Sequence, residues 1–404
     1  MDPISFPPSG EFLQSVRTSS KALREASNIL IEEQAIKRLL LSPAFTSSFK
    51  RVSASHGLAM PLNFPSAAAE LNLLSILSLL NFGSGYRAPL HAETGHGAWD
   101  CMRSFVFSLY ITSSVDEDDL LSARGIQNIS EGKVAELMRV NVHTERPHEN
   151  LQHVTIGELR GPMYDLVKLV TRVLNETGGI LVNSGYPDLG MFVLEALKDG
   201  RKARSDEDDH ADVEVILERL VRAFPAFQDM AVVDGQRIFC FKKALFLIHA
   251  ISIRFGSAQP PPFPVPSTSH MPVFSDNVLP SLLIHLGVID TSGSPNLSLL
   301  FPHAGSPKQL VPLFATAAPG PSDAKVLPKD GPVLSTNQAY ILRAAAIDAC
   351  EMITAVAHTL QEPSLEWLRD IELPALDMWI WAVAKDRPDY RQLERFVLRD
   401  TVYF

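Results

Sequence analysis

The chain has little cysteine, no basic excess and no long apolar run, and each absence excludes a class of protein. Three widely separated cysteines and no CxxC among 404 residues disfavour a disulfide framework and a structural zinc ribbon. With 36 basic and 46 acidic residues the net charge is -10. We therefore expect no direct nucleic-acid binding, which requires a basic surface. The longest apolar stretch, 71–82, is shorter than the roughly 20 residues of a membrane span, so we expect a buried helix there and no membrane partner.

The beginning of the chain and its length set expectations about location and domains. Residues 1–10 lack a basic segment followed by an apolar run, so we do not expect a signal peptide. The few cysteines fit a reducing, cytoplasmic location. At roughly 150 residues per domain the length allows two or three domains, but composition does not change along the chain. We therefore expect one helical domain over 1–404, with 1–12 flexible.

Helical periodicity dominates the apolar pattern. It predicts helices over 15–41, 134–140, 164–174, 190–197, 213–223, 242–254, 278–286, 338–360 and 373–384. One β-hairpin is predicted over 230–241, because Asp234-Gly235 separates two short β-prone runs. Charged or proline-rich segments predict inserted loops at 201–210, 256–272 and 317–332. The expected fold class is mainly α with one small hairpin.

Common catalytic motifs are absent: the sequence contains no GxGxxG, GxxxxGK[ST], HExxH or GxSxG. His91, Glu93 and His96 are candidate metal ligands, but their spacing separates the histidines on a helix and also fits a polar loop. The run 83–86, Gly-Ser-Gly-Tyr, fits either an anion cradle of backbone N–H groups or the end of a helix. The run 175–179, Asn-Glu-Thr-Gly-Gly, predicts a helix C-terminus.

Asp276 precedes a predicted helix that contains Pro280 in its first turns. Proline is tolerated only where no backbone N–H is needed, which makes Asn277 the better N-cap residue. Asp276 is then left without a structural role beside a proline-rich loop. On the residues alone, it fits a site carboxylate and a plain turn residue equally well.

A second group of candidates lies at 377–386. Asp377 and Trp381 share a helix face at i, i+4, and Pro388 ends the helix just beyond Asp386. The pattern alone favours a buried tryptophan core with Asp386 at the helix end over a binding site. Lys242 begins an apolar helix and fits either a phosphate ligand or a surface lysine with a buried stem.

Several spaced motifs occur in a fixed order along the chain: 175–178, 224–229, 234–237, 241–244, 274–280, 285–287, 376–386 and 402–404. In combination they resemble the queuosine salvage family of queuosine 5'-phosphate N-glycosylases. The resemblance is clear from about residue 165 onwards and fainter over 25–82, around His56 and the Leu-Asn-Phe at 80–82. Residues 83–160 and the proline-rich insertions depart from the family pattern, which puts ligand contacts from 83–160 in doubt.

The resemblance implies a mainly α fold related to helical DNA glycosylases, and an enzyme that hydrolyses the bond between ribose 5-phosphate and queuine. It implies a small-molecule substrate, queuosine 5'-phosphate, and no metal or cofactor. Asp276 matches the catalytic aspartate, whose charge would stabilise an oxocarbenium-like transition state. The expected substrate-binding residues are His56, Phe274, Asp377, Trp381, Asp386 and, for the phosphate, Lys242.

Two other functions remain open on the sequence. A non-catalytic helical protein of the same fold would bind a nucleotide or a protein partner without releasing product. A metallohydrolase would use His91, Glu93 and His96. The sequence indicates no particular oligomeric state.

Overall fold

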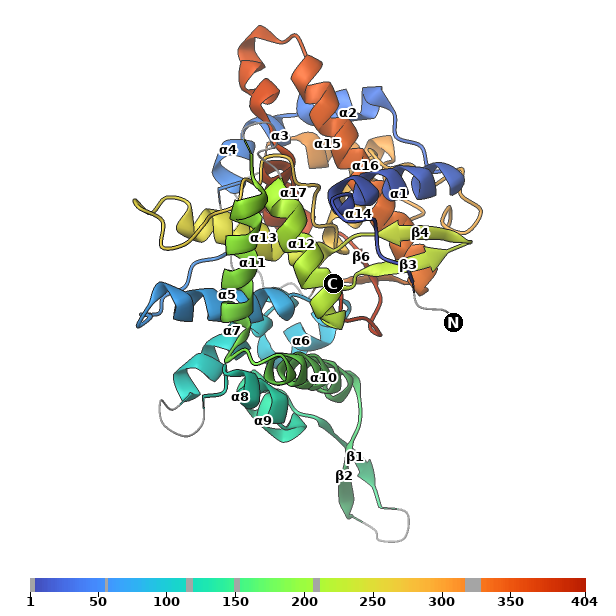
Figure 1. Cartoon of the computed structure of the whole chain (residues 1–404). Coiled ribbons are helices and arrows are strands. Elements are labelled where there is room, and N and C mark those ends of the chain that lie inside the picture. The colour runs from blue at the N-terminus through green and yellow to red at the C-terminus, as the bar shows by residue number, and fades with distance from the viewer. Residues whose placement is uncertain (1–3, 55–56, 114–118, 149–152, 206–210, 317–327) are drawn as a thin grey trace.

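The structure is a computed structural model that describes residues 4–54, 57–113, 119–148, 153–205, 211–316 and 328–404. His56 lies outside the described residues, as do 206–210 and 317–327 of two predicted loops. Helices predominate throughout the described chain (Figure 1). The expected mainly α class is confirmed.

The helices, with 3₁₀ helices labelled η, are α1 (Phe12–Ala26), α2 (Glu33–Leu40), α3 (Pro43–Thr46), α4 (Phe49–Val52), α5 (Ala67–Leu79), η1 (Ser84–Tyr86), α6 (Arg87–Thr94), α7 (Ala98–Thr112), α8 (Ala123–Asn128), α9 (Glu131–Met138), α10 (Pro162–Asn183), α11 (Leu189–Ala203), α12 (Ala211–Ala223), η2 (Pro225–Phe227), α13 (Lys242–Phe255), α14 (Val278–His285), α15 (Pro307–Phe314), α16 (Thr336–Thr359), η3 (Pro363–Asp370), α17 (Leu373–Asp386) and α18 (Pro388–Arg391). The strands are β1 (His143–Pro147), β2 (Thr155–Leu159), β3 (Met230–Val233), β4 (Gln236–Phe239), β5 (Asp330–Val333) and β6 (Arg395–Val397).

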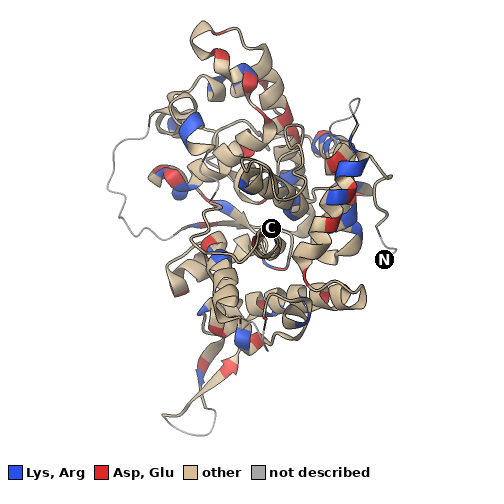
Figure 2. Ribbon diagram, turned by 60° about the vertical axis from the view of Figure 1, so that its left-hand side comes forward, with Lys and Arg blue, Asp and Glu red and all other residues tan. Residues whose placement is uncertain are grey.

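The buried helices α5, α13 and α17 position the elements around the site. Helix α5 is buried along 71–79 and packs against α11 and α13, which confirms the buried helix expected there. Helix α14 packs against α16 and α17. Among the described residues no single helix is long and apolar enough to cross a membrane, and only α5 taken with 84–94, across a 68° bend, reaches that length and composition. Acidic and basic residues are interspersed over the ribbon (Figure 2).

The predicted hairpin is confirmed and two further strand pairs were missed. Strands β3 and β4 pair antiparallel, and Asp234 and Gly235 turn the chain with φ of 49° and 81°, as this two-residue turn requires. The exposed β1–β2 hairpin extends away from α8–α10 (Figure 1). Strands β5 and β6 pair in parallel across more than 60 residues of sequence. Their short runs carry no alternating pattern that could have predicted them.

Two helix predictions were wrong in their boundaries. The predicted helix 15–41 is divided into α1 and α2, with Asn28 at φ 54° between them. The stop predicted at 175–179 does not occur, because α10 continues to Asn183. Asn175 instead donates to three carbonyls at the end of α8, and a Cβ on Gly178 would lie 2.4 Å from the Gln127 nitrogen. The run is therefore a close contact between two helices.

The loop predictions are partly confirmed. Residues 256–272, all described, contain neither helix nor strand, as their prolines require. Helix α11 extends to Ala203, so the predicted loop at 201–210 begins later than expected. Strand β5 occupies the end of the predicted loop at 317–332.

Candidate active site

A cavity of about 340 Å³ lies where α6, α7, α13, α14, α17 and β6 meet. Five of its lining residues are lysine or arginine and two are acidic, although the whole chain carries a net charge of -10. The basic residues are Arg87, Lys242, Lys385, Arg391 and Arg395, and the acidic ones are Asp100 and Asp276. The cavity therefore favours an anionic ligand.

A smaller recess of about 20 Å³ adjoins this cavity. The two spaces share four lining residues, Asn81, Lys242, Asp276 and Trp381. The recess is lined in addition by Phe246, Phe274, Asp377 and Met378. Its size admits the edge of a ligand, while a ring or sugar requires the larger cavity.

Asp276 lies where the two spaces meet, at the start of α14. Asn277 is the N-cap residue and Pro280 lies in the first turn, as predicted. The expectation that Asp276 has no structural role is wrong: its Oδ1 accepts hydrogen bonds from the backbone N–H of Val278 (2.6 Å) and Leu279 (3.4 Å). Within the described chain its Oδ2 has no hydrogen-bond donor, and the side chain lines both spaces. One carboxylate oxygen is thus held by the helix and the other is available to a ligand.

Asp377 projects from α17 into the recess, on the face that also carries Trp381, as the i, i+4 spacing predicted. Its Oδ2 accepts a hydrogen bond from the Phe274 N–H at 2.6 Å. Burial raises the pKa of Asp377 to about 8; the hydrogen bond from Phe274 opposes this rise, and the charge of Asp276 adds to it. A carboxyl group with a pKa above 7 is mostly protonated at neutral pH and can then donate a hydrogen bond.

Lys242 is the first residue of α13 and is buried between the site carboxylates. Its Nζ donates to the carbonyl oxygen of Asn81 (2.5 Å) and to Asn81 Oδ1 (3.0 Å). Burial lowers its pKa to about 8, an effect that Asp276 opposes. Asn81 belongs to the Leu-Asn-Phe run of the sequence, which is thus brought into the site.

A buried ion pair that sequence reasoning missed supports these residues. Arg343 of α16 binds both carboxylate oxygens of Asp229, at 2.8 and 2.5 Å, with both side chains at most 1% exposed. Arg343 Nε also donates to the Ser275 carbonyl (2.8 Å), while Asp229 Oδ2 accepts from the Lys242 N–H (3.1 Å). The pair therefore connects the backbone beside Asp276 with the start of α13. Asp229 stood in a recognised motif, but nothing in the helical pattern of α16 distinguished Arg343.

Phe274 and Trp381 supply aromatic surface to the recess. Phe274 is buried and lies 5.4 Å from the His249 ring, between centroids. Trp381 meets Trp99 edge to face at 6.0 Å, and Lys385 Nζ lies 3.7 Å from the Trp381 ring centroid. Trp381 is half-buried, packs against the core and also lines the recess, so its role in binding stays a prediction.

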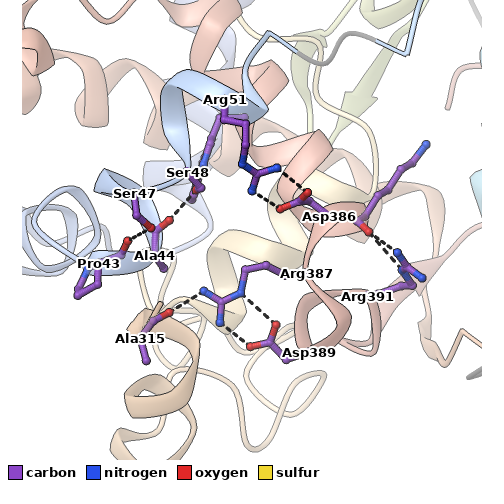
Figure 3. A network of polar contacts seen from close by, with 12 residues as sticks. Pro43, Ala44, Ser47, Ser48, Arg51, Ala315, Asp386, Arg387, Asp389 and Arg391 are labelled. Atoms are coloured by element: carbon purple, nitrogen blue, oxygen red, sulfur yellow. Dashed lines mark hydrogen bonds and ion pairs between the residues drawn. The ribbon is translucent and has the colours of Figure 1, made fainter. Parts of the chain in front are cut away.

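Asp386 is not brought together with Asp276 and Asp377. It is the last residue of α17 and lines neither the cavity nor the recess, but a third hollow of about 650 Å³ that shares Trp381 and Lys385 with the cavity. Arg51 of α4 binds it through both carboxylate oxygens, at 2.9 and 2.7 Å (Figure 3). That ion pair lowers the pKa of Asp386. A substrate-binding role for Asp386 stays a prediction.

The candidate metal ligands are dispersed. His91 and His96 line the cavity, while the exposed Glu93 accepts a hydrogen bond from the Asn141 N–H. Within the described residues, no three His, Cys, Asp or Glu side chains form a group able to hold a metal ion. The run 83–86 follows the end of α5, and the Gly83 N–H donates to the Phe404 carbonyl. The run thus follows the end of a helix, as the structural alternative predicted, and contacts the C-terminal residue.

Comparison with known proteins bears on this cavity. The family model described as queuosine salvage protein matches residues 107–298. The resemblance to the queuosine salvage family is confirmed. A mouse protein named queuosine 5'-phosphate N-glycosylase/hydrolase is 30% identical over 122 residues, which are 30% of this chain and 31% of that protein. The chain thus matches about a third of that relative's length.

The matched span contains part of the site. It includes Lys242, Phe274 and Asp276, and it begins earlier than the residue near 165 at which the resemblance was expected to become clear. Asp377 and Trp381 lie beyond its end. They reach the site because α17 packs against α14.

Proposed function

We propose that this protein is an N-glycosylase that hydrolyses queuosine 5'-phosphate and releases queuine. The observation that carries the proposal is the position of Asp276, between a cavity lined by cations and a recess that ends at a second carboxyl group, Asp377. A nucleotide requires such an arrangement: an anion site for the phosphate, a carboxylate beside the sugar and polar groups for the base. The family match over 107–298 supports the same reaction class.

Asp276 stabilises the transition state in this proposal. Cleavage of an N-glycosidic bond builds positive charge on the anomeric carbon and the ring oxygen. A carboxylate already held by the Val278 and Leu279 N–H groups meets that charge without reorganising. In the overall reaction water is added across the N-glycosidic bond: its hydroxyl group joins the anomeric carbon, and a proton joins the departing base.

Asp377 acts on the departing base. A 7-deazapurine has no N7 to protonate, so its leaving must be assisted at another atom. Asp377 lines the recess, and its raised pKa of about 8 keeps it protonated at neutral pH. It donates to the edge of the base that enters the recess beside Phe274, while Trp381, which lines both spaces, contacts the ring in the larger cavity. Asp377 and Asp386 were both expected to bind substrate, and the proposal gives this role to Asp377 because Asp386 pairs with Arg51.

The test of this function is product release. Purified full-length protein is incubated with queuosine 5'-phosphate without added metal, and free queuine is measured by mass spectrometry. We expect stoichiometric release of queuine and ribose 5-phosphate. Binding of the nucleotide without release would instead indicate a non-catalytic binding protein, and the absence of binding would contradict the proposal altogether.

The pH profile tests the role of Asp377. Because its pKa is raised to about 8, the active protonated form prevails below that pH, and kcat should fall as pH rises through about 8. Asp377→Asn cannot transfer a proton but keeps an oxygen for the Phe274 N–H. We expect it to lower kcat by about a hundredfold and to abolish the alkaline decline.

Lys242 titrates in the same range, since burial lowers its pKa to about 8, so the variant is needed to separate the two groups. An alkaline decline that persists unchanged in Asp377→Asn would assign it to Lys242 and contradict the role given to Asp377. Circular dichroism at each pH shows whether either protein unfolds.

A further inference from the structure

Three neighbouring residues that line the large cavity carry buried polar atoms without a partner. Ser84 Oγ, Arg87 Nη1 and His91 Nδ1 are buried and have no hydrogen-bond partner in the described chain. All three residues line the cavity, and they follow one another on η1 and α6. Buried polar atoms normally have hydrogen-bond partners. Three unpartnered atoms on neighbouring residues therefore indicate a position where a polar ligand supplies the missing hydrogen bonds.

Two more arginines, Arg391 and Arg395, line the same cavity. Arg391 donates through Nε and Nη2 to the Lys385 carbonyl (Figure 3), and Arg395 through Nη2 to the Ala384 carbonyl. Arg87 Nη2 donates to the Arg391 carbonyl at 2.6 Å. Within the described residues none of these guanidinium groups forms an ion pair with a carboxylate. They are oriented by main-chain oxygens, and the nearby carboxylates Asp330 and Asp276 act on Arg87 and Arg395 without a direct ion pair.

Without a bound anion, the positive charges of these arginines destabilise one another. Burial and the charges of Arg87 and Arg391 lower the pKa of Arg395 to about 9, an effect that Asp276 opposes. Burial also lowers the pKa of Arg87 to about 10, an effect that Asp330 opposes. Like charges collected around one cavity destabilise one another unless an opposite charge joins them. A phosphate monoester, with up to two negative charges and three acceptor oxygens, suits several guanidinium groups better than a carboxylate does.

We propose that Ser84, Arg87, His91, Arg391 and Arg395 form a subsite for a phosphate monoester, the 5'-phosphate of the nucleotide. The proposal rests on the function proposed above. It places the phosphate at these five residues and not at Lys242, whose Nζ already donates two hydrogen bonds to Asn81. Three of the five residues come from the segment 83–160, in which the sequence resembles the family least.

The subsite lies on the sugar side of Asp276. Arg395 is near enough to Asp276 for that carboxylate to raise the Arg395 pKa, whereas Asp377 lines the recess and not the large cavity. A nucleotide with its phosphate at Arg87 and Arg395 therefore brings its ribose to Asp276 and the edge of its base to the recess. The anion then positions the glycosidic bond.

The test measures binding of ribose 5-phosphate, ribose and inorganic phosphate to the full chain by isothermal titration calorimetry. We expect ribose 5-phosphate to bind, ribose to bind at least about tenfold more weakly, and inorganic phosphate to compete. Arg395→Gln and Arg391→Gln should each weaken ribose 5-phosphate binding by about tenfold or more, as the loss of one charged hydrogen bond predicts. Arg391 is exposed, so its variant tests the subsite even where Arg395→Gln fails to fold.

Arg399→Gln is the matched control, because Arg399 donates to the Gly85 carbonyl beside the same segment but does not line the cavity. Its binding should equal that of the wild type. Equal affinity for ribose 5-phosphate in wild type, Arg391→Gln and Arg395→Gln would overturn the subsite. Arginine-dependent binding without release of queuine would support the subsite and contradict the glycosylase function. Release of queuine at the wild-type rate by these variants would support the glycosylase function and contradict the subsite.

Discussion

Replacing Asp276 with asparagine is expected to lower the rate of queuine release from queuosine 5'-phosphate by at least about a hundredfold. The loss of one preorganised electrostatic group at a reacting centre has an effect of this order. Asparagine keeps an oxygen that accepts the Val278 and Leu279 N–H groups, so the start of α14 should persist. The measurement is single-turnover release of queuine, with circular dichroism to verify the fold.

Asp290 offers a matched control for this substitution. Its Oδ1 accepts a hydrogen bond from the N–H two residues later, Ser292, at 2.8 Å, as the Oδ1 of Asp276 does from Val278. It is exposed and lines neither the cavity nor the recess. Asp290→Asn should therefore turn over at the wild-type rate. Equal rates for Asp276→Asn and the wild type would refute the catalytic assignment.

Arg343→Met should lower the free energy of unfolding by about 3–5 kcal/mol. This is the usual cost of removing one partner of a fully buried ion pair, because the other charge stays buried without compensation. Asp229 would be that charge, at 1% exposure. Urea denaturation followed by circular dichroism measures the change. The Ser275 carbonyl would also lose its Arg343 Nε donor, so we expect slower turnover in whatever fraction stays folded.

The control for this experiment is an exposed pair. Lys37 and Glu33 form an i, i+4 ion pair on α2, with side chains 36% and 62% exposed. Lys37→Met should change the free energy of unfolding by about 0–1 kcal/mol. If Arg343→Met costs no more than Lys37→Met, the Asp229–Arg343 pair is not a main support of the site.

Local sequence patterns predicted most of the helices and the β3–β4 hairpin, because both depend on neighbouring residues. The two-residue turn at Asp234-Gly235 requires positive φ at both positions, which a dipeptide can indicate by itself. The same local reasoning failed at Asn175, where the residues that end many helices instead bind the end of α8. A glycine required for close packing between helices looks the same in sequence as a glycine that ends one.

The candidate site was predicted only in part. Asp276, Asp377 and Trp381 do line connected spaces, as the resemblance implied. Asp386 does not, because one further turn of α17 separates it from Trp381 and brings it to Arg51. His56 lies outside the described residues.

The sequence by itself determined the mainly α class, the hairpin, the cap at Asn277 and the resemblance to the queuosine salvage family. These features depend on residue types and on spacings of a few residues, which can be read directly from the sequence. Only the tertiary structure decided which charges are neutralised. Arg343 pairs with Asp229, 114 residues away, while Arg87, Arg391 and Arg395 line one cavity and form no ion pair with a carboxylate of the described chain. Such choices depend on how distant helices pack, and no local pattern of residues records that.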